Sequence, residues 1–249
     1  MSNKTLLLAA HGSSQHDGNN PILRLAETLH EQKIFNEVLC GFLRQQPFLR
    51  NVLSQIQATE LSVIPMFSGF GYITDTLIPK ALGQVSNEIT VHLYDPIGVH
   101  PNIPMIMAKR ASSIIKEHGL HPAEVTVLVV AHGHTKNFQN ADQTNAMAAD
   151  LKKIMNGITT STAFIEEAPL ISDWPKFTTA EHLIVLPYMI GGGLHTQEDV
   201  PIMLGLNSGD YDQTPVTGPL SAHGKTIWYC RAFGFEEALS DIIVGIVSE

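Results

Sequence analysis

The sequence predicts an α/β protein with two similar domains, each a parallel sheet flanked by helices. Two observations lead to this fold class. Short apolar runs rich in Val, Ile and Leu alternate with longer stretches that have helical spacing. The same series of segments then occurs a second time along the chain. Strands that alternate with helices are joined by right-handed crossovers, which produce parallel sheets covered on both faces.

The repeat is visible as short matches at a nearly constant offset. Residues 5–12, TLLLAAHG, resemble residues 126–133, TVLVVAHG, at an offset of 121. Further matches follow in the same order at offsets of 122 and 123, namely FLRQQP (42–47) with FIEEAP (164–169), VIP (63–65) with VLP (185–187), Thr74 and Pro79 with Thr196 and Pro201, and PIGVH (96–100) with PLSAH (219–223). Two units are too few for a solenoid. We therefore expect two similar domains, residues 1–120 and 121–249, joined near residues 119–123.

The elements expected in each half follow from the same patterns. Apolar runs predict strands, at 5–10, 37–43, 61–66 and 89–94 in the first half and at 125–131, 161–165 and 182–188 in the second, with a weaker fourth near 214–217. Helical spacing predicts helices, at 21–33, 47–58, 101–118 and 138–155. In parallel α/β folds, ligands bind beyond the carboxyl ends of the strands. The loops that follow the strands are therefore where we expect a site.

Composition narrows the classes of partner and location. The chain has 249 residues, of which 44 % are hydrophobic and 16 % charged, so it can bury a core. Its net charge of −9 argues against a nucleic-acid partner, which needs a basic face. Two cysteines are too few for a disulfide framework, and we expect reduced, buried thiols. No run approaches the roughly 20 apolar residues of a membrane helix, and TLLLAA is short for a signal peptide, so we expect no membrane association and a cytoplasmic location.

Three consecutive strands of the second half each end at a polar side chain. His132 follows the strand 125–131, the pair Glu166 and Glu167 follows 161–165, and the strand 182–188 leads into a glycine-rich loop with His195. Taken singly, each histidine could be a core or capping residue and each acid a solvated loop residue. Because the carboxyl ends of parallel strands meet at one edge of a sheet, the three together predict a functional site.

This set of side chains suits two kinds of chemistry. Two histidines and a carboxylate suit a borderline divalent ion such as cobalt, nickel or iron. Imidazole also titrates near neutral pH, so the histidines suit general-base work. Glu198 and Asp199 follow His195 within one helical turn, and we interpret them as favourable charges at a helix N-terminus in preference to metal ligands.

Three other motifs can be excluded. Histidine phosphatases have Arg-His-Gly after the first strand, whereas alanine precedes both His11 and His132 here. HTQEDV, which begins at His195, is not the His-Glu-x-x-His helix of zinc proteases. No Walker A or dinucleotide-binding glycine fingerprint occurs.

The ordered set of motifs resembles a known family. A strand followed by AHGSS or AHGHT, then Phe-(Leu/Ile)-Glu before a proline, then a glycine loop with His-x-x-Glu-Asp-Val-Pro, resembles the class II chelatases. These are the sirohydrochlorin cobaltochelatases and ferrochelatases of cobalamin and sirohaem synthesis, and the resemblance covers nearly the whole chain. It implies two chelatase-like domains that face each other across a cleft. It also implies that His132, Glu166 and His195 are the catalytic and metal-binding residues.

The first half departs from the family pattern. His11 is kept, but Arg44 stands at the position of Glu166 and Ile73 at the position of His195. We therefore expect the active site in residues 121–249. Arg44 is open to two interpretations, a clamp for a substrate carboxylate or an ordinary surface arginine. The candidate substrate-binding residues, which include backbone amides of the glycine loops, are His11, Ser13, Ser14, Arg44, His134, Gly191, Gly192 and Gly193.

The resemblance implies insertion of a divalent metal into a sirohydrochlorin-type tetrapyrrole, in which the histidines take the pyrrole protons or hold the ion. The metal is a substrate (cobalt, iron or nickel), and no organic cofactor is expected. A tetrapyrrole or metal carrier without turnover is the alternative on the same fold. Ligand type does not choose among these metals. The sequence leaves open which tetrapyrrole is bound and whether the chain forms a homo-oligomer.

Overall fold

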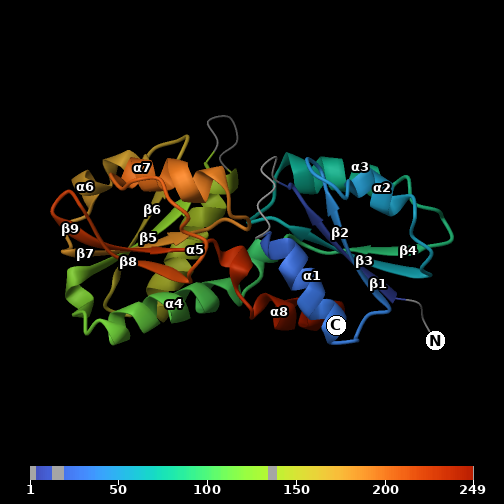
Figure 1. The fold of residues 1–249 in the computed structure, drawn as a ribbon, viewed down its shortest axis with the longest axis horizontal. Coiled ribbons are helices and arrows are strands. Elements are labelled where there is room, and N and C mark those ends of the chain that lie inside the picture. Colours follow the sequence, from blue (N-terminus) through green and yellow to red (C-terminus); the bar gives the residue numbers. More distant parts are fainter. Residues whose placement is uncertain (1–3, 13–19, 134–138, 249) are drawn as a thin grey trace. The chain divides into compact units, whose positions relative to one another are not determined.

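The computed structural model describes residues 4–12, 20–133 and 139–248, which form two compact units (Figure 1). Unit 1 comprises the chain up to His100 together with the segment from Gly234 onward. Unit 2 runs from Pro101 to Phe233. Each unit is built around one sheet with helices on both faces, so the predicted α/β class with two similar domains is confirmed.

In the described part of the chain, the sheet of unit 1 has four parallel strands in the order β2-β1-β3-β4. They are β1 (Lys4–Ala10), β2 (Glu37–Phe42), β3 (Glu60–Met66) and β4 (Thr90–Leu93). The helices are α1 (Pro21–Glu31), α2 (Leu49–Leu53), α3 (Ile78–Leu82) and α8 (Leu239–Ser248). Figure 1 shows α2 and α3 on one face of this sheet and α1 and α8 on the other. Leu7 and Val63 of the sheet pack with Leu49 and Ile78 on the first face.

The described residues of unit 2 form a five-stranded sheet in the order β6-β5-β7-β9-β8. Its strands are β5 (Val125–Ala131), β6 (Thr159–Phe164), β7 (His182–Pro187), β8 (Val216–Ala222) and β9 (Lys225–Cys230). The longer helices are α4 (Ile103–Glu117) and α5 (Gln139–Ile154), and the shorter ones are α6 (Trp174–Phe177) and α7 (Val200–Leu204). All pairings are parallel except that of β8 with β9, which is antiparallel.

The fourth strand predicted for the second half, near 214–217, falls on a strand, but that strand is not the fourth parallel one. The strand that pairs in parallel with β7 is β9, residues 225–230. The predicted segment overlaps instead the start of β8, the antiparallel edge strand. His223 and Gly224 join β8 to β9 with φ of +51° and +70°. Positive φ at both residues of a two-residue connection is the geometry of a tight hairpin, which the apolar pattern alone does not reveal.

Strand register also corrects the last repeat match. Glu60 pairs with Thr90 in unit 1, and His182, 122 residues beyond Glu60, pairs with Thr226 in unit 2. Thr90 and Thr226 are 136 residues apart, and so are the first residues of α4 and α8. The equivalence of 96–100 with 219–223 is therefore wrong, and the second half contains 14 additional residues before β9.

The last helix of each half belongs to the other unit. Helix α4 packs beside α5 in unit 2, where Arg110 donates a hydrogen bond of 3.0 Å to the Arg231 carbonyl. Helix α8 packs beside α1 in unit 1, where Lys4 Nζ donates to the Val247 carbonyl at 2.9 Å. The packing thus divides the chain after residues 100 and 233, while the division after residue 120 follows the repeat and stays a prediction.

Two composition-based expectations can be checked directly. No helix within residues 4–12, 20–133 or 139–248 has the length and apolar character needed to span a bilayer. Cys40 and Cys230 are both buried and neither forms a disulfide, in agreement with the expectation of reduced, buried thiols. Burial raises the pKa of the Cys40 thiol to about 12, so this cysteine is not a nucleophile at neutral pH.

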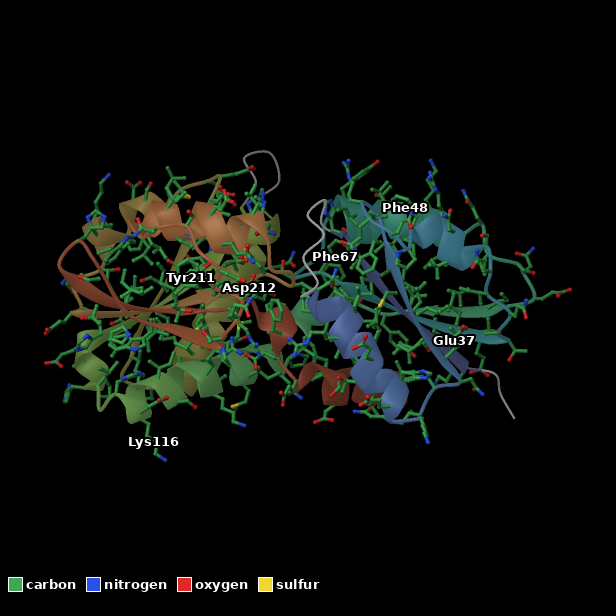
Figure 2. The ribbon with its side chains drawn as sticks, in the orientation of Figure 1. Glu37, Phe48, Phe67, Lys116, Tyr211 and Asp212 are labelled. Carbon is green, nitrogen blue, oxygen red and sulfur yellow. The ribbon has the colours of Figure 1, made fainter. Side chains whose placement is uncertain are left out.

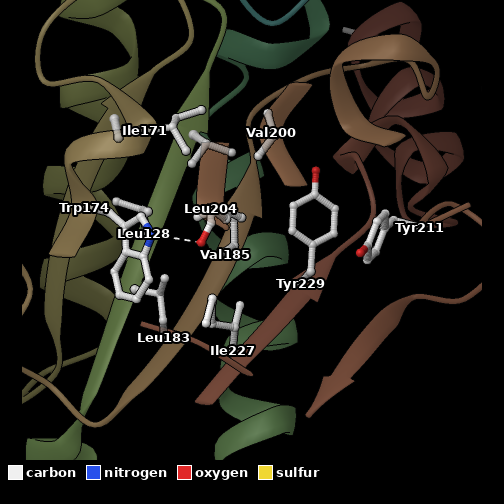
Figure 3. Packing of buried hydrophobic residues seen from close by; sticks show 13 residues of the cluster. Leu128, Ile171, Trp174, Leu183, Val185, Val200, Leu204, Tyr211, Ile227 and Tyr229 are labelled. Atoms are coloured by element: carbon white, nitrogen blue, oxygen red, sulfur yellow. Dashed lines mark hydrogen bonds between the residues drawn. The ribbon is translucent and has the colours of Figure 1, made fainter. Parts of the chain in front are cut away.

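The core of unit 2 on the α6 and α7 face is centred on Trp174 (Figure 3). Its indole is fully buried, and Nε1 donates a hydrogen bond of 3.2 Å to the carbonyl oxygen of Leu204 at the end of α7. Leu128, Leu183 and Ile227 lie in the same cluster and come from three different strands. One side chain therefore connects the sheet, α6 and the helix that follows the His195 loop.

Replacing Trp174 with Ala should lower the free energy of unfolding by about 3–5 kcal/mol, because a large cavity remains and the Leu204 carbonyl loses its donor. Urea denaturation of the wild type and the variant measures the difference. Phe177→Ala at the end of the same helix is the control, since that ring is 37 % exposed and should contribute little. Equal losses in both variants would contradict a core centred on Trp174.

Candidate active site

The candidate site begins where β5 ends. His132 follows the strand directly, and its Nδ1 lies 2.9 Å from the Gly133 carbonyl oxygen. Because a carbonyl oxygen can only accept a hydrogen bond, Nδ1 must carry the hydrogen. A neutral His132 therefore presents Nε2 as a free lone pair, on a side chain that is 40 % exposed.

The backbone at the end of β6 is hydrogen-bonded to the same residue. The N–H groups of Ile165 and Glu166 donate to the His132 carbonyl oxygen at 3.2 and 3.0 Å. This brings the Glu166 carboxylate to 3.8 Å from His132 Nε2. Gly133 has φ of +75°, and a Cβ there would lie 2.9 Å from the Phe164 Cβ and from the side chain of Glu167. The glycine is thus required both by its φ and by the close approach of β6.

His195 lies at the start of a π-helical turn, η5 (His195–Asp199), that leads directly into α7. Its ring centroid is 4.8 Å from that of His132, with the two rings nearly perpendicular. His195 Nδ1 lies 2.6 Å from Asp199 Oδ2, and an ionised carboxylate only accepts. Both imidazoles therefore have Nδ1 occupied as a donor, and in its neutral form each ring has its lone pair on Nε2.

The structure brings together the three residues that the sequence predicts as the catalytic and metal-binding set. His132, Glu166 and His195 come from the ends of β5, β6 and β7, which are adjacent strands. Within residues 4–12, 20–133 and 139–248, no three His, Cys, Asp or Glu side chains are already arranged as a metal-binding cluster. The assignment of His132, Glu166 and His195 as metal ligands and bases stays a prediction. The geometry places two imidazoles and one carboxylate at the same edge of the sheet.

The chain matches the CbiX family over residues 5–114 and 126–249. It belongs to the CbiX family. The two matched segments correspond to the two sequence halves, so the repeat found above is a repeat of the CbiX unit itself.

Individual relatives agree with this membership. A probable sirohydrochlorin cobaltochelatase of Halobacterium salinarum is 28 % identical over 266 residues, which cover 97 % of this chain and 89 % of the relative. Among solved structures, a multi-domain Deinococcus radiodurans protein with structural similarity to chelatases has a TM-score of 0.77 at 23 % identity. The match covers all of this chain and 55 % of that protein, so the chain spans about half its length.

The sirohydrochlorin chelatase SirB from Bacillus subtilis subspecies spizizenii, solved in complex with cobalt, has a TM-score of 0.71 at 14 % identity. The match covers 99 % of this chain and 94 % of SirB. At these identities the two solved structures support the shared fold of the CbiX family. They leave the roles of individual side chains in this chain as predictions.

The first-half positions share the backbone geometry of the second-half site. His11 Nδ1 lies 3.0 Å from the Gly12 carbonyl oxygen, and the Arg44 N–H donates to the His11 carbonyl at 2.9 Å. Arg44 thus stands where Glu166 stands in unit 2. Its side chain is exposed, and no ion pair to it occurs in the parts of the chain that the structure describes. Its role as a carboxylate clamp stays a prediction, as does the role of His11.

The remaining predicted substrate-binding residues fall into two groups. Ser13, Ser14 and His134 lie outside the described residues. Of the three glycines before His195, Gly193 has φ of +129° and is buried, and its N–H donates to Thr196 Oγ1 at 3.1 Å. This amide is therefore already used within the turn. Gly191 is exposed, with open space where a Cβ would stand, so neither crowding nor its φ requires glycine there.

Sequence reasoning missed the role of Asp199. We interpreted it as a helix N-terminal charge, but it accepts the Nδ1–H of His195. The i, i+4 spacing of His195 and Asp199 could have suggested this contact, since such residues are neighbours on a helix. In unit 1 the equivalent pair is Ile73 and Leu77, so the histidine and its acid are both replaced by apolar residues.

A second carboxylate near the site, that of Asp212, could not be identified from any motif in the sequence. Asp212 precedes β8 and is only 2 % exposed (Figure 2). Its Oδ2 lies 3.2 Å from both Thr196 Oγ1 and Gln197 Nε2, the two residues that follow His195. Oδ1 is buried and has no hydrogen-bond partner among the described residues. Burial raises the pKa of Asp212 above its ordinary value, although hydrogen bonds from Gln197, Thr196 and Gly193 act in the opposite direction.

The raised pKa of Asp212 predicts a pH-dependent stability difference. Folding favours the protonated acid, so this stabilisation is present below the ordinary pKa of 3.8 and is lost as pH rises through the folded value. Asp212→Asn removes the ionisation. The free energy of unfolding of this variant relative to wild type should therefore rise between pH 4 and pH 8, by about 1.4 kcal/mol per unit of pKa elevation.

Urea denaturation at both pH values measures this effect. Asp95→Asn replaces an exposed aspartate and is the matched control for the loss of one carboxylate. A difference for Asp212→Asn that is the same at pH 4 and pH 8 would contradict the elevated pKa.

Proposed function

We propose that this chain inserts a divalent metal ion, Co²⁺ or Fe²⁺ with Ni²⁺ as a further candidate, into a sirohydrochlorin-type tetrapyrrole. The observation that carries the proposal is the pair of imidazoles of His132 and His195, in both of which Nδ1 is occupied and Nε2 is available. The two ring centroids lie 4.8 Å apart, and Glu166 lies beside His132. Membership of the CbiX family and the likeness to a probable sirohydrochlorin cobaltochelatase support the choice of substrate.

The proposed chemistry exchanges two protons for one metal ion. As M²⁺ enters the macrocycle, the two pyrrole N–H protons leave, so the charge of the complex does not change. Nε2 of His132 and Nε2 of His195 each accept one of these protons. Each resulting imidazolium has a carboxylate beside it, Glu166 at 3.8 Å from His132 and Asp199 at 2.6 Å from His195. Later loss of the protons to water restores the neutral bases.

Glu166 has a second proposed task. Its carboxylate is half exposed, so it can meet the hydrated cation before the metal reaches the macrocycle. Carboxylate and imidazole ligands are suited to borderline divalent ions. Together, His132, Glu166 and His195 hold the metal as substrate and move the protons that it displaces.

Replacing His195 with Ala should reduce the rate of metal insertion by a factor of about 100 or more, the usual contribution of a positioned acid or base. The side chain is 46 % exposed, so its loss should leave the fold intact, which circular dichroism and thermal unfolding can check. His92→Ala, at an exposed position on β4 of unit 1, is the matched control and should keep wild-type rates. Wild-type rates of metal insertion in His195→Ala would contradict the assignment of His195 as a catalytic base and metal ligand.

A mixing experiment separates an enzyme from a carrier. Sirohydrochlorin at a 50-fold or greater excess over protein is combined with Co²⁺, Fe²⁺ or Ni²⁺, and absorbance follows formation of the metallated product. We expect many turnovers per protein molecule and a preferred metal. Product that stops at one equivalent per protein would point instead to a tetrapyrrole or metal carrier.

A further inference from the structure

Unit 2 contains a segment that unit 1 lacks. Helices α3 and α7 begin 122 residues apart, whereas β4 and β9 pair with their neighbours at positions 136 residues apart. The 14 additional residues therefore lie between the end of α7 at Leu204 and the start of β9 at Lys225. Most of this stretch is a loop that carries Tyr211 and Asp212, followed by the edge strand β8.

The additional segment contacts the π-helical turn that bears His195. Asp212 Oδ2 is within 3.2 Å of Thr196 Oγ1 and of Gln197 Nε2. The Gly209 N–H donates to the Gln197 carbonyl at 3.0 Å. The turn is thus held through both residues that follow His195, from a loop that is distant from them in sequence.

A neighbouring strand holds the turn from a second direction. The hydroxyl of Tyr229 on β9 donates to the Thr196 carbonyl oxygen at 2.9 Å. The Tyr229 ring packs edge-on against the ring of Tyr211, with centroids 4.9 Å apart (Figure 3). Tyr211 is anchored in turn by its hydroxyl, which donates to the Asn207 carbonyl at 2.7 Å. Because Tyr211 precedes Asp212, this packing fixes the backbone that delivers the carboxylate.

Unit 1 provides a natural comparison for the same turn. Thr74 is bonded to Gly71 in unit 1 as Thr196 is bonded to Gly193 in unit 2, so the two turns have the same internal hydrogen bonds. In unit 1 the Thr74 hydroxyl lies 2.8 Å from the carboxylate of the next residue, Asp75. In unit 2 that next position is Gln197, and the carboxylate comes from Asp212 instead. The acceptor carboxylate is therefore exposed and part of the turn in unit 1, whereas in unit 2 it is buried and comes from outside the turn.

We propose that Asp212 is a positioning residue that fixes the turn of His195, and through it the approach of His195 Nε2 to His132 and to the substrate. The inference rests on the proposed function only for its kinetic readout. A buried carboxylate with one oxygen unpaired is costly to the folded state, and an apolar residue would fill the same space at lower cost. The two side chains that donate hydrogen bonds to Asp212, Thr196 and Gln197, both belong to the turn that bears His195. The contacts of Asp212 therefore serve to place that turn.

The size of the effect follows from the geometry that proton transfer needs. A displacement of about 1 Å at a reacting group can cost about 100-fold in rate. Asp212→Ala removes the acceptor of Gln197 Nε2 and leaves the Thr196 hydroxyl only the Gly193 carbonyl oxygen, so we expect kcat to fall by about 10- to 100-fold. KM for metal and for tetrapyrrole should change by less than about 3-fold, because Asp212 is buried and does not meet the substrate. Asp212→Asn retains an acceptor oxygen and should keep kcat within about 3-fold of wild type.

The test compares Asp212→Ala, Asp212→Asn and the matched control Asp75→Ala in the 249-residue chain. Asp75→Ala removes the equivalent acceptor from a turn that has no histidine, so kcat should be unchanged. A second readout is the imidazole ¹H–¹⁵N NMR spectrum of histidine-labelled protein, with the His195 signals assigned from their absence in His195→Ala. In Asp212→Ala the chemical shifts of the His195 ring should move away from those of the Nδ1–H tautomer seen in the wild type. The chemical shifts of His11 in unit 1 should stay unchanged. If Asp212→Ala does not fold, Gln197→Met, which removes one donor and keeps the shape, takes its place.

Three outcomes would overturn the proposal. The first is wild-type kcat together with unchanged His195 signals in Asp212→Ala or Gln197→Met. The second is a loss in Asp212→Asn as large as in Asp212→Ala, since the acceptor alone would then not explain the effect. The third is an equal loss in Asp75→Ala. If the wild-type protein inserts no metal at all, the proposed function fails, and the NMR comparison still decides whether Asp212 positions His195.

Discussion

Two backbone hydrogen bonds, from Ile165 and Glu166 to the carbonyl oxygen of His132, hold the ends of β5 and β6 together. The rest of the candidate site depends on them, because they bring a carboxylate to the free nitrogen of the histidine. The bond from Arg44 to the His11 carbonyl repeats this arrangement in unit 1. Since these bonds use only the main chain, they form whatever side chains are attached. The scaffold is therefore common to both units, and the chemistry is decided by a few substitutions upon it.

The turn after β7 follows the same logic. Its internal bonds to Thr196 have counterparts at Thr74, so the π-helical turn forms in both units. In unit 2 the turn presents His195 with Asp199 as its partner, and in unit 1 both positions are apolar. The histidine and the acid that accepts its Nδ1–H are thus present together in unit 2 and absent together in unit 1.

The sequence could predict whatever depends on local patterns or on repetition. Apolar runs locate seven of the nine described strands closely, and parallel topology explains why His132, Glu166 and His195 meet at one edge. It could not predict the β8–β9 hairpin, because the repeat has no counterpart for an inserted segment. The sequence also could not single out Asp212, because there it is one acid among several in a polar loop. Its burial follows from the packing of Tyr211 on Tyr229.

The placement of α8 has a consequence for synthesis on the ribosome. Unit 2 is one continuous stretch, from Pro101 to Phe233, so all of its strands and helices are present once that stretch has emerged. Unit 1 begins first but also needs α8, whose Leu239, Ile243 and Val247 are buried, and this helix is synthesised after all of unit 2. The first sheet therefore has one apolar face incompletely covered until α8 has emerged. The unit with the candidate active site can be complete before the unit that precedes it.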